Sequence, residues 1–223
     1  IHEGLRSVLN ADKFNDSQRV QIGLPEREGG MCLVTAHDIL LPAYVGGSGS
    51  VALFYKKCGW PEAQVLYNVL KSQPALVTAV DELNEMFDHN KHRVTVPYLD
   101  PDLPHAWPRQ SKLTKAVQRV CADDLEAQLV RIDAAAASWF ASCRLHGSGA
   151  WLHSSPKIAL FRVSSQLYRV MLAMRLMVKT PSTDLVARCV CGSTGWQLRY
   201  GVHWFSSCRC ATLKTARHNA VVK

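Results

Sequence analysis

The longest regular pattern in this sequence is a run of apolar or small residues between Leu113 and Cys143. The run occupies positions 113, 117, 121, 125, 129, 132, 136, 140 and 143. Residues three or four apart share one face of an α-helix, so the run predicts one amphipathic helix, about 45 Å long if unbroken. Asp123 and Asp124 are predicted to lie on its solvated face. Small residues at 134–137 would let a neighbouring helix approach closely.

Helical spacing also predicts shorter helices before this run. The first covers residues 1–23, with Ser17 as its candidate cap. The second begins at Thr35, where Asp38 three residues later completes a capping-box pattern. Pro42 is expected to kink or shorten this second helix, because proline cannot donate a backbone hydrogen bond.

Two further segments carry the same spacing. Residues 61–87 repeat apolar positions at helical intervals. The segment that ends before Pro181 predicts a helix capped by Ser164 or Ser165, with Arg169 and Arg175 pointing outward. The residues predicted to point inward are Leu167, Val170, Met171, Met174 and Met177. A Met-rich stripe of this kind is typical of a helix packed in a core.

Proline and glycine interrupt these helical patterns. Leu24-Pro25 ends the first helix, and Gly29-Gly30 predicts a tight turn. The Gly-Gly-Ser-Gly-Ser segment at 46–50 is consistent with either a flexible linker or a close contact between helices. Residues 88–109 contain four prolines and predict a loop or linker.

Length and composition exclude several classes of protein. With 223 residues, 48% of them hydrophobic, the chain can form one large or two small domains and is not expected to be disordered. Apolar runs are too short for a membrane span, and no signal peptide is visible. The chain begins at Ile1 rather than at an initiator methionine, which suggests a fragment or a processed product. Internal repeats, phosphate-binding glycine loops and hydrolase or zinc-protease motifs are absent from the sequence.

Cysteine and histidine cluster towards the C-terminal end. Cys189, Cys191, His203 and Cys208 follow the spacing C-x-C-x11-H-x4-C. Three cysteines and one histidine form a ligand set typical of structural zinc, so the pattern predicts zinc as a cofactor. Cys210 is a further thiol, which leaves open which three cysteines bind. The alternative is that these cysteines are free or buried and bind no metal.

The other four of the eight cysteines lie far apart among apolar neighbours, at positions 32, 58, 121 and 143. Such an arrangement does not resemble a disulfide framework. They are therefore predicted to be reduced core residues of an intracellular protein.

Charge is distributed unevenly along the chain. Residues 1–100 carry 9 Lys and Arg against 12 Asp and Glu, whereas residues 101–223 carry 17 against 6. From Lys157 to the end there are 11 basic residues and one acid, Asp184. A basic segment beside a zinc-like cluster favours nucleic acid as the partner, with a solvated basic surface as the alternative.

Together these patterns predict a mainly α protein, either a helical bundle or a helical array, with a small irregular zinc-knuckle module at its C-terminal end. Four regions follow from the breaks: a helical domain at 1–87, a Pro-rich linker at 88–109, a helical linker domain at 110–180 and a basic zinc-knuckle-like module at 181–223.

Several separated stretches resemble one family, in the order in which they occur there. Residues 21–33 (QIGLPEREGGMCL), 36–46 (AHDILLPAYVG) and 147–152 (GSGAWL) precede the cysteine-histidine series and residues 217–221 (RHNAV). This series resembles the region downstream of the polymerase core in non-LTR retrotransposon reverse transcriptases that carry a restriction-like endonuclease. The resemblance covers most of the chain except residues 56–110.

The resemblance implies roles for particular residues. The region before the linker would be thumb-like, and the helices between about 110 and 180 would contact template RNA or target DNA. Cys189, Cys191, His203 and Cys208 would hold zinc. Phosphate contacts would come from Arg162, Arg169, Arg175, Arg188, Arg199, Arg209 and Lys214. Base stacking would come from Trp196, Tyr200 and Trp204, which could equally pack around a zinc core.

The chain also departs from the family pattern. The paired aspartates of the polymerase lie upstream in the family, and Asp123-Asp124 lacks their sequence context. The acidic cluster of the endonuclease would follow Arg217-His218-Asn219, beyond Lys223. The family's Gly-Asp-His before the knuckle is Gly201-Val202-His203 here, which loses an acidic neighbour.

The sequence therefore predicts a noncatalytic, nucleic-acid-binding part of a reverse-transcriptase-like retroelement protein. Its parent would be an RNA-directed DNA polymerase, its partner DNA or RNA rather than a membrane, and its location intracellular and nuclear. One alternative is a retroelement-derived structural or protein-interaction protein, including a decayed copy of the element. Another is an enzyme that uses Cys208 or His218, for which the sequence supplies no motif.

Overall fold

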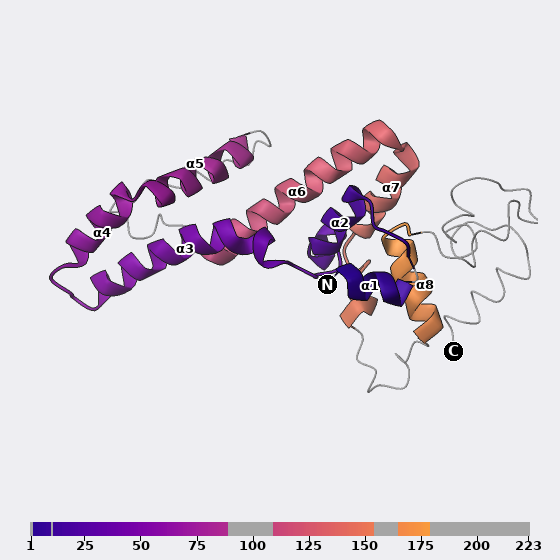
Figure 1. Cartoon of the computed structure of the whole chain (residues 1–223), viewed down its shortest axis with the longest axis horizontal. Helices are drawn as coiled ribbons and strands as arrows, with labels where there is room; N and C mark the ends of the chain where they lie inside the picture. The colour runs from indigo at the N-terminus through magenta and orange to yellow at the C-terminus, as the bar shows by residue number, and fades with distance from the viewer. Residues whose placement is uncertain (1, 10, 89–108, 154–164, 179–223) are drawn as a thin grey trace, which may run out of the picture.

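The computed structural model describes residues 2–9, 11–88, 109–153 and 165–178, and these residues are mainly helical and contain no strand (Figure 1). Their elements are α1 (His2–Leu9), α2 (Asp16–Gly23), the 3₁₀ turn η1 (Glu26–Glu28), α3 (Ala36–Lys57), α4 (Ala63–Ser72), α5 (Pro74–Asp88), α6 (Gln110–Ile132), α7 (Ala134–Cys143), the 3₁₀ turn η2 (Ala150–His153) and α8 (Ser165–Arg175). The predicted mainly α class is confirmed. The predicted loop within 89–108 and the zinc-knuckle module at 181–223 lie outside the described residues.

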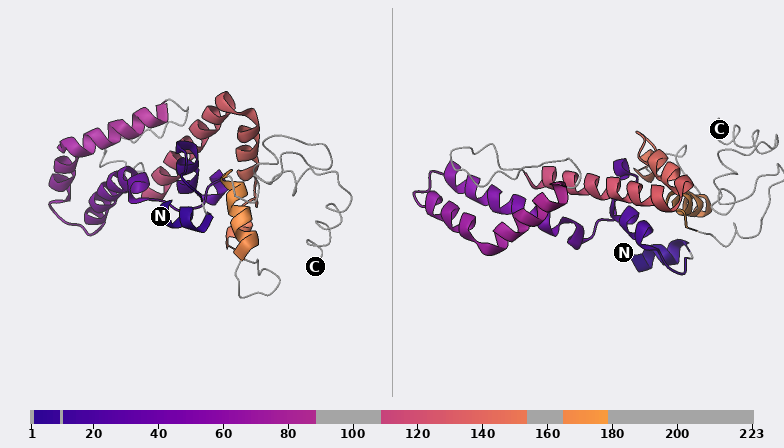
Figure 2. Two further views of the ribbon diagram at one scale, coloured as in Figure 1. Left: turned by 45° about the vertical axis from the view of Figure 1, so that its right-hand side comes forward. Right: turned by 90° about the horizontal axis from the view of Figure 1, so that it is seen from above.

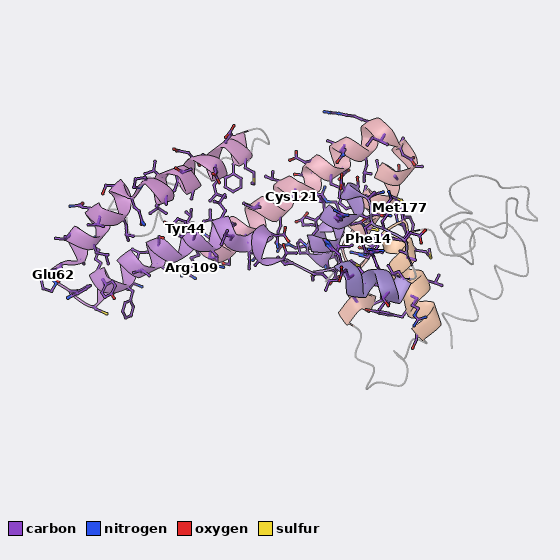
Figure 3. All side chains as sticks on the ribbon, in the orientation of Figure 1. Phe14, Tyr44, Glu62, Arg109, Cys121 and Met177 are labelled. Atoms are coloured by element: carbon purple, nitrogen blue, oxygen red, sulfur yellow. The ribbon has the colours of Figure 1, made fainter. Side chains whose placement is uncertain are left out.

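The helices form two groups joined by α6 (Figure 1). The group that we call the arm consists of α3, α4, α5 and the first half of α6. The group that we call the body consists of α1, α2, α7, α8 and the second half of α6. Both views of Figure 2 keep these groups at opposite ends of α6. Figure 3 shows Tyr44 and Glu62 along the arm, and Phe14 and Met177 within the body.

Three apolar clusters hold these groups together. In the arm, Val45 of α3, Phe87 of α5 and Leu113 of α6 belong to one buried cluster. In the body, α1 and α2 pack on α8, and α6 packs on α7. The regions predicted at 1–87 and 110–180 therefore do not pack as separate units, because each contributes helices to both groups.

The predicted single helix from 113 to 143 is wrong at Asp133. There the backbone becomes extended, α6 ends, and α7 packs back along α6 (Figure 1). The Asp133 carboxylate accepts hydrogen bonds from the backbone N–H groups of Ala135 at 2.9 Å and Ala136 at 3.1 Å. The first amide groups of a helix have no partner within it, and the Asp133 side chain supplies one. A new helix can therefore begin at Asp133 even though the apolar spacing continues past it.

The predicted helix over 1–23 is also divided. Residues 11–15 separate α1 from α2, and Asn15 rather than Ser17 is the cap. The Asn15 side chain accepts from the Gln18 N–H at 2.8 Å, and the Gln18 side chain accepts from the Asn15 N–H at 3.0 Å. This reciprocal pair is a capping box, which fixes where α2 begins.

The capping box predicted at Thr35 is confirmed. The Asp38 carboxylate accepts from both the N–H and the hydroxyl of Thr35, each at 2.7 Å. Of the two effects expected of Pro42, a kink or a shortening, the shortening is wrong, because α3 continues through Pro42 to Lys57.

Residues 46–50 are helical rather than a linker, and they make a close helix contact. A Cβ atom on Gly46 would lie 2.5 Å from the Cα of Gln110 at the start of α6. Only glycine lets the two helices approach this closely. The hydroxyls of Ser48 and Ser50 donate to carbonyls one turn earlier, those of Tyr44 and Gly46, each at 2.8 Å. These bonds keep the serines compatible with a helix.

Of two smaller predictions, one is confirmed and the other is only partly correct. The tight turn at Gly29-Gly30 is confirmed, since Gly29 has a left-handed φ of 84° that ends η1. The cysteines at 32, 58, 121 and 143 are free, as predicted, but only Cys143 is fully buried, whereas Cys32 and Cys58 are exposed.

Within the described ranges, no helix, not even the 22-residue α3, is both long and apolar enough to cross a membrane.

Candidate nucleic-acid interface

Most of the predicted site lies outside the described residues. This applies to the four predicted zinc ligands, Cys189, Cys191, His203 and Cys208. It also applies to Arg162, Arg188, Arg199, Arg209, Lys214, Trp196, Tyr200 and Trp204. In the part of the chain that the structure describes, no three His, Cys, Asp or Glu side chains are grouped to hold a metal ion. Arg169 and Arg175, both on α8, are the two predicted residues that can be placed.

Those two arginines have opposite environments. Arg169 is exposed, as predicted, whereas Arg175 has only 3% of its surface exposed. The prediction that Arg175 points outward to a phosphate is wrong. Leu172 and Ala173 of α8 and Leu176 just after it are buried in the core, so the buried side of this segment includes Arg175. The Met174 and Met177 side chains are only half-buried.

The Arg175 guanidinium is used within the body. Its Nε donates to the carbonyl of Gly30 and its Nη2 to that of Glu26, both at 3.0 Å. Longer bonds of 3.4 Å reach the carbonyls of Cys143 and Ser148. Burial lowers the pKa of Arg175 from that of an exposed arginine, while electrostatic interactions with Cys143 and Glu26 oppose the shift. A buried cation is tolerated when its donors are hydrogen-bonded.

This arrangement joins two of the stretches that carry the sequence resemblance. Gly30 and Glu26 belong to the 21–33 stretch, and Ser148 belongs to the 147–152 stretch. A Cβ atom on Gly149 would clash with the Glu26 side chain, so any other residue at that position would force Glu26 to move. In the described residues, these stretches are therefore a structural joint around Arg175 rather than a surface for nucleic acid.

Side chains from α2 and α7 complete the joint at the end of α8. Trp139 donates to the carbonyl of Met174 at 2.8 Å, and Gln21 donates to that of Arg175 at 2.9 Å. Gln18 donates to the next two carbonyls, those of residues 176 and 177, at 3.1 Å each. The last carbonyls of a helix have no partner within it, so these amides and the indole replace a C-terminal cap.

A second arginine, Arg144, neutralises acids on α6. It lies 2.6 Å from Glu126, 2.7 Å from Asp123 and 3.1 Å from Glu28. Burial by itself would lower the pKa of Arg144, but its hydrogen bonds to Asp123 and Glu126 raise it overall. Asp123 is thus ion-paired rather than merely solvated, while Asp124 is exposed as predicted. With three acids around one arginine, this end of α6 does not attract phosphate.

The first half of α6 has the opposite character. It bears an exposed group that we call the basic α6 face, which consists of the N-cap residue Arg109 and of Lys112, Lys115 and Arg119. Their spacing of three and four residues follows one side of the helix over about 15 Å. The sequence contains no acid between Arg109 and Ala122, and none of the four forms an ion pair with a described residue.

The basic α6 face was missed as a set of candidate residues, although the sequence contained its signal. The opposite side of this half of α6 carries Leu113, Val117 and Val120, all buried in the arm. Basic residues at three- and four-residue intervals between these apolar positions must then face solvent. Lys and Arg side chains with no acidic neighbours are the groups that contact a phosphate backbone.

A cleft of about 440 Å³ lies where the arm meets the body, and its lining includes Arg19, Asp38, Glu82 and Cys121. Burial, followed by the charges of Asp124 and Asp38, raises the pKa of the Cys121 thiol. A thiol with a raised pKa is a poor nucleophile, so this cleft does not activate a cysteine.

Comparison with known proteins gave no matching family model, no matching curated protein and no matching solved structure.

Proposed function

We propose that this chain is a nucleic-acid-binding part of a reverse-transcriptase-like retroelement protein, of the non-LTR type with a restriction-like endonuclease. It would position template RNA or target DNA in the nucleus and have no catalytic activity of its own. The observation that carries the proposal is the basic α6 face, four exposed cations with no acid among them. The order of the stretches that resemble the family supports the choice of parent.

Binding through this face would be mainly electrostatic. Lysine and arginine displace counterions from phosphates, so affinity falls with salt, by a log–log slope of about −0.9 for each phosphate contact on B-DNA. Contacts to phosphate carry little sequence information, which predicts weak sequence preference. Arg169 and the basic residues of 181–223 would extend the same surface chemistry, whereas Arg175 no longer belongs to the set.

Zinc remains part of the proposal for residues 181–223. Cys189, Cys191, His203 and Cys208 would hold one ion, and its binding would supply folding free energy that a short segment cannot obtain from a core of its own. Metal analysis of the purified chain tests this, since Cys189→Ser or His203→Ala should abolish stoichiometric zinc. Unchanged metal content in both variants would exclude the site.

The binding experiment measures affinity of the chain for single- and double-stranded RNA and DNA at several salt concentrations. Replacing Lys112, Lys115 and Arg119 by Gln should weaken binding to every sequence and make the salt slope shallower by roughly one unit per lost contact. Arg131→Gln is the matched control, because Arg131 is exposed near the other end of the same helix. An equal loss in the control, or binding that ignores salt, would contradict the proposal.

A retroelement-derived protein-interaction role remains as a second candidate. The observation that favours it is a set of exposed apolar side chains on α3, including Leu40 and Phe54. Such side chains do not bind phosphate, and exposed apolar surface is typical of protein contacts.

A further inference from the structure

The turn between α3 and α4 lies at the end of the arm farthest from the body (Figure 1). We call residues 54–60, which lead into this turn, the arm tip. Two large rings there are open to solvent, since Phe54 is 61% exposed and Trp60 is 43% exposed. Tyr55 lies between them, with its ring centroid 5.7 Å from that of Phe54 and 4.3 Å from that of Trp60. The arm tip therefore presents three neighbouring aromatic rings.

The backbone of the turn holds Trp60 in place. Gly59 has a left-handed φ of 69°, and its N–H donates to the carbonyl of Lys56 at 3.1 Å. The Trp60 N–H donates to the carbonyl of Tyr55 at 3.2 Å. These two bonds form a Schellman helix end, in which the residue after the glycine packs on the last turn of the helix. The contact between Trp60 and Tyr55 is of this kind, so the rings are positioned before any partner binds.

Two exposed lysines, Lys56 and Lys57, belong to the same tip. They are the only charged residues in the sequence from Ile39 to Pro61. Exposed rings by themselves suit either a protein or a nucleic acid, but cations beside them favour a partner that carries negative charge. Aromatic rings with neighbouring cations bind single-stranded nucleic acid, because the rings stack on bases while the cations contact phosphates.

The position of the arm tip relative to α6 points to the same partner. Gly46 of α3 lies against Gln110 at the start of α6, and Phe54 is eight residues, or about 12 Å, further along α3. Lys57 follows Gly46 by about three turns, so it lies on the side of α3 that approaches α6. Figure 3 shows Glu62 at the outer end of the arm and Arg109 nearer the body. The arm tip and the basic α6 face thus follow one another over about 30 Å.

The opposite end of the basic α6 face is unfavourable for phosphate. One turn after Arg119, α6 carries Asp123 and Glu126, two of the three acids around Arg144. This excess of negative charge repels a strand that continues along α6 towards the body. A strand bound to the basic α6 face is therefore favoured to continue past Arg109, towards the arm tip.

We propose that the arm tip stacks on the bases of an unpaired strand, either RNA or single-stranded DNA, whose phosphates lie on the basic α6 face. The inference rests on the proposed function and names its substrate class. Bases in a duplex already stack on one another, so their faces are not open to Phe54 and Trp60, whereas an unpaired strand offers them. Every base has a π-face, so stacking agrees with weak sequence preference.

The test measures, by fluorescence anisotropy, binding of the full chain to oligo(U) and oligo(dT) and to duplexes of the same length. Strands of roughly ten nucleotides can follow the whole path, at about 3.4 Å for each stacked nucleotide. Phe54→Leu should weaken binding to single strands about fivefold or more, because it removes a stacked ring. The salt slope and duplex binding should not change, because no cation is lost. Phe54→Tyr keeps a ring and should bind like the unmodified chain.

The matched control is Val65→Ala on α4. Val65 is 61% exposed, the same fraction as Phe54, but it has no ring, so this variant should bind single strands normally. Trp60→Leu should act like Phe54→Leu. Because Trp60 also packs on Tyr55, circular dichroism must show that this variant is folded. The Phe54 variants decide the test if it is not.

A second measurement locates the contact directly. A single strand that carries 5-iodouridine forms a covalent bond, on irradiation, with an aromatic side chain stacked on the modified base. Mass spectrometry of the digested complex should find this bond within residues 54–60, and Phe54→Leu with Trp60→Leu should remove it.

Two results would overturn the inference and leave the proposed function standing. One is normal single-strand binding by Phe54→Leu while replacement of Lys112, Lys115 and Arg119 by Gln weakens it. The other is an equal loss for Phe54→Tyr and Phe54→Leu, or for single strands and duplexes, which would exclude stacking on bases and favour the protein-interaction role. Absence of binding to any nucleic acid at low salt would overturn the inference together with the proposed function.

Discussion

The body and the arm use their polar and charged side chains in opposite ways. In the body, Arg175 and Arg144 are directed inward, to backbone carbonyls and to carboxylates. In the arm, the cations of the basic α6 face are exposed, and so are the apolar side chains of Leu40 and Phe54 on α3. The difference indicates that the body's arginines mainly maintain the fold, while the arm leaves charged and apolar groups exposed.

The same residue type therefore has different consequences in the two groups. An arginine that satisfies buried carbonyls cannot be removed without leaving those acceptors unpaired, which costs far more than the loss of a surface cation. Unfolding free energies of matched variants measure this difference directly. The loss in the free energy of unfolding is expected to be largest for the buried Arg175 of the body and smallest for the exposed basic α6 face.

The largest effect is expected for Arg175→Met. The variant leaves the carbonyls of Gly30 and Glu26 without their donor in a buried site, so the free energy of unfolding should fall by ~3 kcal/mol or more. Chemical denaturation measures the change. Arg169→Met on the same helix is the control and should change stability by about 0.5 kcal/mol or less, because Arg169 is exposed. Equal effects at both positions would remove the distinction between body and surface.

The next effect is expected within the arm, at its closest helix contact. Gly46→Ala would place a Cβ atom 2.5 Å from the Cα of Gln110 and should destabilise the chain by ~1–3 kcal/mol through overpacking. Gly47→Ala is the matched variant, since the space around Gly47 is open. It should stabilise α3 by up to ~1 kcal/mol, the difference in helix propensity between alanine and glycine. Thermal unfolding that ranks the two variants in the reverse order would contradict the contact between α3 and α6.

A smaller loss is expected for Arg144→Met. The ion pairs with Asp123 and Glu126 are partly exposed, so solvent screens them and their removal should cost ~1–2 kcal/mol. Added salt should reduce the difference between variant and unmodified chain, because salt screens exposed charges. Denaturation at low and high salt measures both quantities, and a loss that does not depend on salt would point to packing instead.

The smallest effect on stability is expected for the basic α6 face. Lys112→Gln, Lys115→Gln and Arg119→Gln together should change the free energy of unfolding by about 0.5 kcal/mol or less, since all three side chains are exposed. The same triple variant should lose nucleic-acid affinity. A large fall in the free energy of unfolding would instead show that these cations stabilise the arm.

Local chemistry was readable from the sequence. The capping box at Thr35 and Asp38 and the turn at Gly29-Gly30 were predicted correctly, because each depends on residues within a few positions of one another. The mainly α class was also predictable, since apolar residues at helical spacing dominate the described segments. The zinc ligands remain a prediction that depends on spacing alone.

Tertiary structure decided the rest, because the deciding partners are distant in the sequence. The carbonyls that hold Arg175 lie 149 and 145 positions away, at Glu26 and Gly30, so no local pattern could show that this arginine is buried. Whether residues 46–50 form a linker or a helix contact depended on where Gln110 lies. The sequence by itself determined the mainly α class and the local features at Thr35 and Gly29-Gly30. Packing against distant segments decided which arginines became part of the core and which apolar and basic side chains stayed exposed. A side chain is buried only when another segment packs against it, and the sequence near that residue does not show which segment will do so.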